Sequence, residues 1–472
     1  WCATWYRCGV DVSEPRRKNV ASKIDPARRA AYDVLHEVGS GDAYANVALS
    51  QIQRSHELDP RDAAFCTEVV NGTLRHRGLL DAVIAHCSGR PTAKLDPRVL
   101  DILRMGAYQC LMMRTDAYAA VNTSVELTRS VAGEAPVGLV NAVLRKISAR
   151  SVEAWVSALS DSSASPDEQL AFEYSHPTWV VSSLRDALGS GRAGELPALL
   201  AANNEPARVT LAARPGMANV DDLVAAGAEP GRWSPYAAIA PSGPVGGFPA
   251  VRDRRASVQD EGSQLVAIAL ANAQLEGTDE RWVDLCAGPG GKVALLSAIG
   301  ALRGASTVGI ELHPHRAALV ETSVGPVPGF AGVVVGDARN APIGPGVDRV
   351  LVDVPCTGLG VVRRRPELRW RRTPSDVPAL RKLQVELLNS ALDLVRPGGV
   401  VAYVTCSPHL AETELVVSTA TRRRKDVAIE DSRPLFPNVP DLGNGPNVRL
   451  WPHLHGTDGM FFSLMRRTTP PG

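Results

Sequence analysis

A strand end, a glycine-rich turn and a helix start follow one another within ten residues, VDLCAGPGGK at positions 283–292. Glycines let backbone N–H groups approach a ligand closely, and the N-terminus of the next helix favours a nucleotide-like group there. The candidate cofactor-binding residues of this turn are Cys286, Ala287, Gly288, Pro289, Gly290, Gly291 and Lys292. The turn therefore predicts an α/β domain whose ligand site lies at the end of this strand.

Further apolar runs continue this pattern through the C-terminal half. Strands are expected at 281–285, 306–310, 332–335, 349–352 and 400–405, each followed by a helix-compatible stretch or a glycine-rich loop. Continuously apolar strands that are separated by helices are typical of a parallel sheet covered on both faces. We therefore expect a Rossmann-like domain in this half.

The residues of the turn narrow the class of cofactor. A phosphate-binding loop needs glycine in place of Cys286 and Ser or Thr in place of Val293, and a dinucleotide fingerprint needs glycine at Val293. The acid before the turn, Asp284, suits instead a cofactor with a cationic amino-acid tail, as in S-adenosylmethionine.

Acids that follow the next two strands extend this hypothesis. Glu311 is expected to accept the ribose hydroxyls, and Asp337 the adenine amino group.

The length of 472 residues predicts two to four domains, since a domain typically has roughly 100–200 residues. We expect a disordered leader at 1–24, an all-α domain at 25–150, a linker at 151–174, a small α+β subdomain at 175–259 and the α/β domain at 260–472. No apolar run is long enough to span a bilayer, and the eight cysteines show neither a CxxC pair nor zinc-finger spacing. We expect a monomeric, cytoplasmic protein with no membrane segment and no metal.

Two cysteines follow predicted strands, Cys356 in DVPC at 353–356 and Cys406 in TCS at 405–407. Carboxyl ends of parallel strands meet at one edge of a sheet, and in the usual methyltransferase topology these two strands are neighbours. Methylation of carbon 5 of a cytosine needs a thiolate that adds to carbon 6, and a second group that assists loss of the carbon-5 proton. The two thiols fit this reaction, and spacing alone leaves open which of them is the nucleophile.

An amino-methyltransferase is the main rival among enzymes. It would carry Asn or Asp followed by Pro-Pro and an aromatic residue after the fourth strand, where this chain has DVPC. Chemistry at an exocyclic nitrogen also needs no cysteine. The sequence therefore favours methylation of a ring carbon.

The α/β half resembles the Nol/Nop/Sun family of RNA (cytosine-5) methyltransferases. The resemblance lies in PGGK at 289–292, DVPC at 353–356, TCS at 405–407 and TDGMFF at 457–462. It implies a class I S-adenosylmethionine-dependent methyltransferase in which Cys406 is the nucleophile, and Cys356 assists proton removal and product release. DNA cytosine-5 methyltransferases place the nucleophile in a Pro-Cys motif instead, so the resemblance, and not the spacing, ranks Cys406 first.

The same resemblance implies that residues 286–292, Glu311, Asp337 and Asp353 line the cofactor. Asp353 stands between the two ligands, and contact with the cytosine edge is the alternative for it. One departure is visible, because this chain has Gly288 where the family often has alanine.

The N-terminal half resembles the helical domain of the antitermination factor NusB. The resemblance lies in GTLR at 72–75, ILRMGAYQ at 102–109 and VNAVLR at 140–145. It implies an RNA-binding module, whereas a bundle that merely packs against the enzyme is the alternative. The two halves together are similar to bacterial family members that methylate 16S ribosomal RNA. A tRNA substrate, or a transcription or assembly factor with secondary catalytic activity, remains open.

Arginines and a tryptophan cluster after the DVPC motif. The candidate RNA contacts are Arg363, Arg364, Arg365, Arg369 and Trp370. Guanidinium groups hold phosphates, and an indole stacks on a base, so this segment predicts an RNA contact beside the site. A solvated charged loop is the alternative, and it is the interpretation we favour for the second basic run at 422–425. The target base has to be unstacked to reach a thiolate, so a loop or exposed helix end of RNA is expected.

Overall fold

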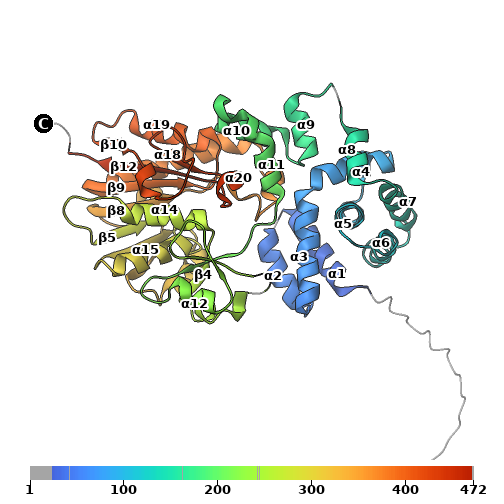
Figure 1. Cartoon of the computed structure of the whole chain (residues 1–472), viewed down its shortest axis with the longest axis horizontal. Helices are drawn as coiled ribbons and strands as arrows, with labels where there is room; N and C mark the ends of the chain where they lie inside the picture. The colour runs from blue at the N-terminus through green and yellow to red at the C-terminus, as the bar shows by residue number, and fades with distance from the viewer. Residues whose placement is uncertain (1–23, 42, 162, 242, 244, 470–472) are drawn as a thin grey trace, which may run out of the picture.

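The computed structural model describes residues 24–469 except positions 42, 162, 242 and 244. The predicted leader at 1–24 thus lies outside the described residues, apart from Ile24. Figure 1 shows a helical half and a sheet-containing half at opposite ends of the molecule. None of the helices in the described ranges combines the length and the apolar character that crossing a bilayer requires.

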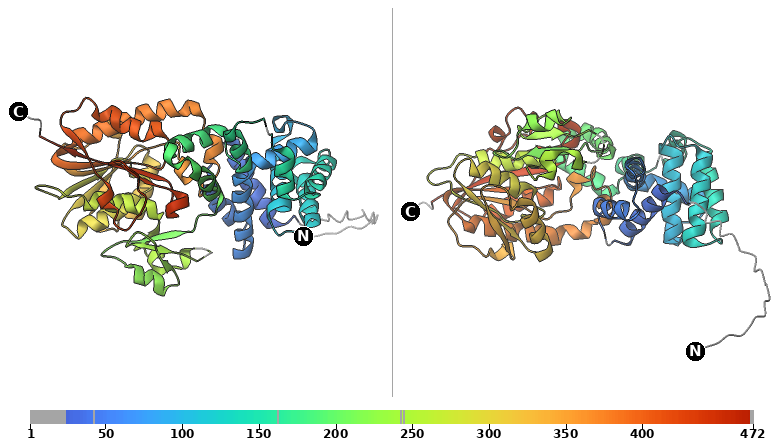
Figure 2. Two further views of the ribbon diagram at one scale, coloured as in Figure 1. Left: turned by 45° about the horizontal axis from the view of Figure 1, so that its top comes forward. Right: turned by 90° about the horizontal axis from the view of Figure 1, so that it is seen from below.

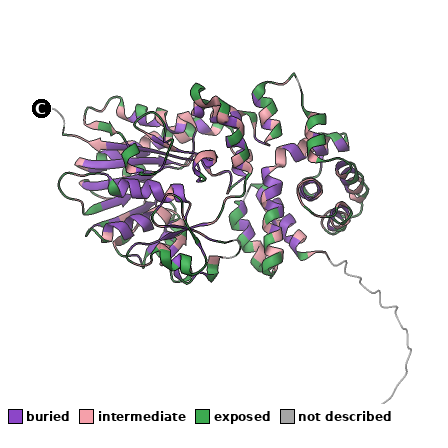
Figure 3. Ribbon diagram, in the orientation of Figure 1, coloured by how far each residue is buried: buried purple, intermediate pink, exposed green. Residues whose placement is uncertain are grey.

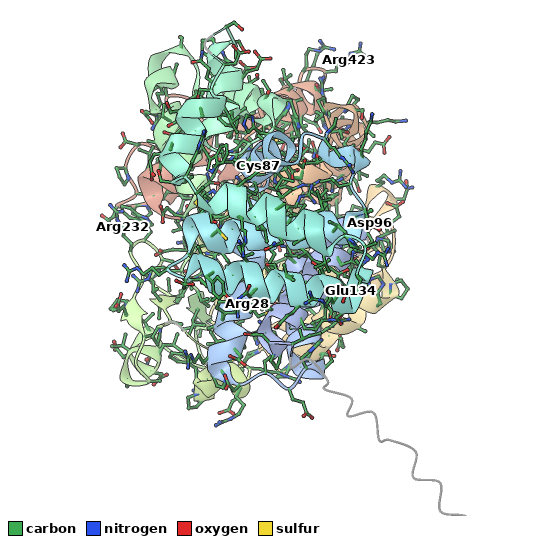
Figure 4. The ribbon with its side chains drawn as sticks, turned by 90° about the vertical axis from the view of Figure 1, so that its right-hand side faces the viewer. Arg28, Cys87, Asp96, Glu134, Arg232 and Arg423 are labelled. Atoms are coloured by element: carbon green, nitrogen blue, oxygen red, sulfur yellow. The ribbon has the colours of Figure 1, made fainter. Side chains whose placement is uncertain are left out.

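The helical half forms the predicted all-α bundle around one apolar core. Its helices are α1 Pro26–Ser40, α2 Ala45–Ser55, α3 Pro60–Arg75, α4 Arg77–Ser88, α5 Pro97–Met112, α6 Ala117–Ala132 and α7 Val137–Ser148. Leu103 of α5 and Leu80 of α4 are fully buried in the core. Helix α5 begins with a cap, because the Asp96 carboxylate accepts from Arg98 N at 2.9 Å with Pro97 at the first helical position. Figure 4 views this half from its end, with Asp96 labelled.

The segment 151–174 contains two helices, α8 Val152–Leu159 and α9 Pro166–Glu173, and is not a simple linker. Trp155 of α8 is buried in the core of the helical half, and its indole N–H donates to Ile147 O at 3.0 Å. Polar residues of this segment act as helix caps, because Ser165 and Glu168 form a capping box at the start of α9. These polar residues mark a helix start.

The region 175–259 contains two packing units. Helices α10 Thr178–Leu188 and α11 Leu196–Asn204 share a core with Leu359 and Trp451 of the C-terminal half. The second unit is a small antiparallel sheet with its own core and the order β2-β3-β1-β4. Its elements are β1 Thr210–Ala213, α12 Val220–Ala225, β2 Glu229–Pro230, β3 Ala237–Ile239, α13 Pro249–Arg252 and β4 Ala256–Val258. This unit projects from the body of the molecule in the left view of Figure 2.

The main sheet has the strand order β10-β12-β9-β8-β5-β6-β7, with β11 paired to β12. Its strands are β5 Arg281–Asp284, β6 Ser306–Glu311, β7 Phe330–Val335, β8 Val347–Asp353, β9 Val395–Thr405, β10 Val427–Glu430, β11 Val448–Leu450 and β12 Met460–Arg467. Strands β5 to β9 are parallel, as predicted, whereas β10, β11 and β12 pair antiparallel. The sheet is therefore mixed, because Phe461 near the start of β12 pairs with Thr405 at the end of β9, so β12 has to run back.

Helices cover both faces of this sheet, as the sequence predicts. They are α14 Glu261–Asn272, α15 Gly291–Ala301, α16 Pro314–Val324, α18 Val377–Leu394 and α19 Glu414–Thr421. Helices α14 and α15 share one core with the sheet, and α18 and α19 share another, on the two sides seen in Figure 1. The strands between them are largely buried in Figure 3. The carboxyl edge of the sheet remains open for a site.

The predicted RNA segment lies between the two halves, with α17 Leu368–Arg371 inside it. Arg369 has no exposed surface, and its guanidinium donates to Asn204 Oδ1 at 2.7 Å and to Asn203 O at 3.0 Å. The Trp370 indole donates to Leu74 O of α3 at 3.1 Å. These contacts attach the segment to α11 on one side and to the helical half on the other.

Replacement of this buried arginine should destabilise the whole chain. Arg369→Ala leaves buried acceptors unpaired and opens a cavity, so the free energy of unfolding should fall by about 2–4 kcal/mol. Urea unfolding followed by circular dichroism measures this loss. Arg365→Ala is the matched control in the same segment, because Arg365 is exposed and stacks only on the Tyr44 ring, an interaction of about 1 kcal/mol or less. Equal losses in the two variants would contradict the role of Arg369.

Candidate active site

The two predicted cysteines lie side by side at the carboxyl edge of the sheet. Strands β8 and β9 are parallel neighbours, with Asp353 opposite Val404. The loops that leave them bring Cys356 Sγ to 3.4 Å from Cys406 Sγ. The predicted adjacency of these strands is confirmed, and the two thiols lie at one site.

Glycine allows the closest backbone contact in this pair of loops. Gly360 N donates to Cys406 O at 2.8 Å, and Gly459 N donates to Gly360 O at 2.8 Å. A Cβ on Gly360 would lie 2.1 Å from Gly459 O and 2.7 Å from Cys406 O. Only glycine therefore lets the cysteine loop and the TDGMFF segment meet here.

The environment of Cys356 keeps its sulfur protonated. Its hydrogen bond with Cys406, followed by burial, raises the pKa of the Cys356 thiol well above its usual value. A thiol is a weaker nucleophile than a thiolate but remains an S–H donor. Cys356 is thus suited to donate a hydrogen bond to the sulfur of Cys406.

The glycine turn packs three charged side chains against one another. Asp284 at the end of β5 is 1% exposed, and its carboxylate accepts from Cys286 N at 3.1 Å. Burial, followed by repulsion from Asp353, raises the pKa of Asp284 to about 7. Lys292 at the start of α15 donates to Asp353 Oδ2 at 2.7 Å. This contact links the predicted cofactor turn directly to the DVPC loop.

Glu311 ends β6 beside the turn and is 4% exposed. Its Oε1 accepts from His313 N at 3.0 Å, and its Oε2 lies 3.4 Å from Arg316 Nη1. A Cβ on Gly288 would lie 2.2 Å from Glu311 Oε2. The Nol/Nop/Sun family often has alanine at this position. Gly288 has no Cβ, and the Glu311 carboxylate occupies the space that a Cβ would fill.

Asp337 follows β7 and lies farther toward the surface. Its carboxylate accepts from Arg339 N at 3.0 Å and forms an ion pair with the Arg339 side chain at 2.6 Å. These contacts lower the pKa of Asp337. Its role toward an adenine amino group stays a prediction. Across the described part of the chain, no three His, Cys, Asp or Glu side chains converge as metal ligands would.

The structure corrects the predicted RNA contacts next to the site. Arg363 is buried, and Arg364 forms ion pairs with Asp458 at 3.0 Å and with Asp260 at 2.7 Å. These guanidinium groups neutralise buried carboxylates, which gives Arg363 and Arg364 a role inside the protein. Arg365 is exposed, and its contact with RNA stays a prediction.

Arg369 and Trp370 join the two halves, as described above, so their prediction as RNA contacts is wrong. The basic run at 422–425 was interpreted as a solvated charged loop, and the structure agrees with this interpretation. Arg422, Arg423 and Lys425 are exposed, and Figure 4 shows Arg423 at the rim of the molecule.

Sequence reasoning missed Glu412, a fully buried acid beside both cysteine loops. Its carboxylate accepts from Thr357, which follows Cys356, and from Ser407, which follows Cys406. The sequence carries only a weak signal for this residue, because a single acid near a helix start usually interacts with the helix dipole or with solvent.

Comparisons with known proteins agree with this geometry. Residues 271–466 match the family model described as 16S rRNA methyltransferase RsmB/F, and residues 25–149 match the NusB family. The chain is 50% identical to a protein of Mycobacterium tuberculosis (strain H37Rv), over 96% of this chain and 98% of that protein. The name of that protein describes a methyltransferase and gives no substrate. Ribosomal RNA small subunit methyltransferase B of Vibrio cholerae is 30% identical over 93% of this chain and 97% of its own. The crystal structure of PH0851 shares the fold, with a TM-score of 0.78 at 24% identity over 94% of this chain and 99% of its own.

The raised pKa of Asp284 predicts a pH-dependent cost to folding. An unfolded aspartate titrates near 3.9, so the folded chain binds more protons between about pH 4 and pH 7, and the free energy of unfolding falls as the pH rises through this window. Asp284→Asn keeps an acceptor for Cys286 N and removes the charge. Its stability relative to wild type should therefore be higher at pH 8 than at pH 5, by about 1–3 kcal/mol.

Urea unfolding of both proteins at the two pH values measures this difference. Asp337→Asn is the control, because Asp337 has a lowered pKa and stays ionised from pH 5 to pH 8. A stability difference between Asp284→Asn and wild type that does not change with pH would show that Asp284 does not titrate in this range.

Proposed function

The chain belongs to the RsmB/F family of 16S rRNA methyltransferases, and on this premise we propose that it methylates carbon 5 of a cytosine in 16S ribosomal RNA, with S-adenosylmethionine as the methyl donor. The pair of sulfurs 3.4 Å apart beside the glycine turn carries this proposal. Methylation at carbon 5 requires a covalent nucleophile and a second group for release, and this edge of the sheet offers both.

We assign the nucleophile to Cys406. Its thiolate forms a bond to carbon 6 of the cytosine, which makes carbon 5 electron-rich enough to accept a methyl group. A water molecule then accepts the carbon-5 proton, the electron pair of the C5–H bond restores the C5–C6 double bond, and the C6–S bond breaks so that the sulfur of Cys406 departs as a thiolate. We assign assistance of the departure to Cys356, because its S–H lies within hydrogen-bond distance of the departing sulfur and can donate a hydrogen bond to the thiolate as it forms.

The residues around the turn fit the proposed donor. Bound S-adenosylmethionine supplies the methyl group. The turn at 286–292 offers backbone N–H groups without obstructing side chains, and the buried Asp284 offers negative charge for a cationic amino-acid tail. Glu311 is proposed for the ribose hydroxyls and Asp337 for the adenine amino group. The ion pair with Lys292 holds Asp353 between the turn and the thiols, where it can face either the cofactor or the cytosine edge.

The NusB domain supports RNA as the substrate, and it provides the argument for ribosomal RNA over tRNA. It packs against the catalytic half through the segment that contains Arg369 and Trp370. An RNA that binds the helical half can thus be held at a fixed orientation to the thiols.

Replacement of each cysteine should separate the two roles. Cys406→Ser should reduce methyl transfer to 16S rRNA by about a thousandfold or more and form no covalent complex, because the attacking thiolate is absent. Cys356→Ser should still attack the RNA but release it slowly, so that a covalent RNA–protein complex accumulates. Radioactive methyl transfer and denaturing gels with 16S rRNA measure both effects. A covalent complex with Cys406→Ser but not with Cys356→Ser would reverse the assignment.

Bisulfite sequencing of a deletion strain tests the substrate. One 16S rRNA cytosine that resists conversion in the parent strain should become convertible in the deletion strain. Re-expression of the wild-type chain should restore resistance, whereas re-expression of Cys406→Ser should not. An unchanged 16S pattern together with a lost tRNA signal would reject ribosomal RNA in favour of tRNA.

A further inference from the structure

Glu412 is a carboxylate buried between the two cysteine loops, with no exposed surface. It ends the short helical turn Leu410–Glu412, which follows the TCS loop. Burial of a carboxylate costs several kcal/mol unless hydrogen bonds compensate for the lost water. The hydrogen bonds to its two carboxylate oxygens therefore show which groups compensate for this burial.

Each oxygen of Glu412 accepts two hydrogen bonds. Oε1 accepts from Thr357 N at 2.9 Å and from Gln384 Nε2 at 3.0 Å. Oε2 accepts from Thr357 Oγ1 at 2.5 Å and from Ser407 Oγ at 2.6 Å. Hydroxyl bonds to a carboxylate are the short, strong kind. A single side chain thus holds the residue after Cys356 and the residue after Cys406.

The rest of the surroundings fixes Glu412 itself. Gln384 of α18 donates also to Pro355 O at 2.9 Å, which precedes Cys356 in the loop. Tyr403 of β9 donates its hydroxyl proton to Glu412 O at 2.6 Å. The main chain of Glu412 is therefore anchored to the sheet and its carboxylate to a covering helix, and both cysteine loops bind this carboxylate.

We infer that Glu412 is a positioning residue that sets the distance between the two thiols and thereby couples Cys356-assisted release to the adduct on Cys406. The inference rests on the proposed function. Glu412 acts through Thr357 and Ser407. Neither cysteine loop is a helix or a strand at the sulfur, so hydrogen bonds to Glu412 take the place of regular backbone pairing there. Displacement of a catalytic group by about 1 Å can cost a hundredfold in rate.

The carboxylate also fixes the direction of both hydroxyl protons. An ionised carboxylate only accepts hydrogen bonds, so Thr357 Oγ1 and Ser407 Oγ both donate toward it. The two hydroxyl oxygens lie 3.1 Å apart, which places the two loops in direct contact behind the sulfurs. A neutral amide at this position could fill the same volume but would reverse the direction of these two bonds.

Glu412→Gln is the test, because glutamine keeps the shape and removes the charge. Its oxygen can still accept from Thr357 N and Gln384, whereas its NH2 group faces the two hydroxyls, which have to become acceptors. Attack on 16S rRNA should persist, while product release should slow by about tenfold to a hundredfold. The covalent RNA–protein complex should accumulate as in Cys356→Ser, with the KM for RNA unchanged and the melting temperature close to that of wild type.

Glu414→Gln is the matched control, because Glu414 lies two positions away, is partly exposed and pairs with Arg449. This variant should turn over like wild type without accumulating the complex. If Glu412→Gln unfolds, Ser407→Ala and Thr357→Val, which each delete one hydroxyl bond, carry the test and should accumulate the complex to a smaller degree.

The inference is overturned if folded Glu412→Gln turns over at the wild-type rate, or if it loses attack and release equally with no accumulated complex. Failure of the proposed function looks different. In that case the wild-type chain itself transfers no methyl group to 16S rRNA and forms no Cys406-dependent complex.

Discussion

The parallel pairing of β8 with β9 is the constraint on which the rest of the site depends. Because Asp353 lies opposite Val404, both loops leave the sheet at the same edge and at the same level. The two sulfurs meet at 3.4 Å only because these strands are neighbours. Backbone pairing brings the loops together, and the buried carboxylate of Glu412 then holds the residues next to each sulfur. The two thiols that the proposed mechanism requires thus lie at one site.

The arginine segment after the DVPC loop connects this chemistry to the helical half. Arg364 neutralises Asp260 and Asp458 beside the site, and Arg369 satisfies backbone and amide oxygens of α11. Burial of so much positive charge is tolerated because each guanidinium finds several acceptors. The NusB domain is therefore attached through groups that also border the catalytic loops. The attachment of the helical half and the stability of the catalytic loops therefore depend on the same segment.

Local sequence patterns predicted the helices and strands in which apolar residues recur at a regular spacing. The apolar runs predicted β5 to β9, and the all-α domain was expected at 25–150, because apolar periodicity depends on neighbours in the chain. The antiparallel strands β10, β11 and β12 were missed, because β10 and β11 are short and the pairing of all three is set by residues distant in the chain. The segment 151–174 was interpreted as a linker, although its Ser and Glu residues cap a helix.

The sequence by itself determined the elements of the candidate site: the glycine turn, the acids after successive strands and two cysteines that each follow a strand. These features are local, so composition and order suffice to recognise them. Only the tertiary structure decided which charged groups are free and which are used for folding. Arg369 and Trp370 look like RNA contacts in the sequence, but Asn204 and Leu74, far away along the chain, engage them. The same holds for Glu412, whose partners Thr357 and Gln384 become neighbours only after the sheet forms. Burial and charge pairing depend on contacts between distant segments, and no local period encodes them.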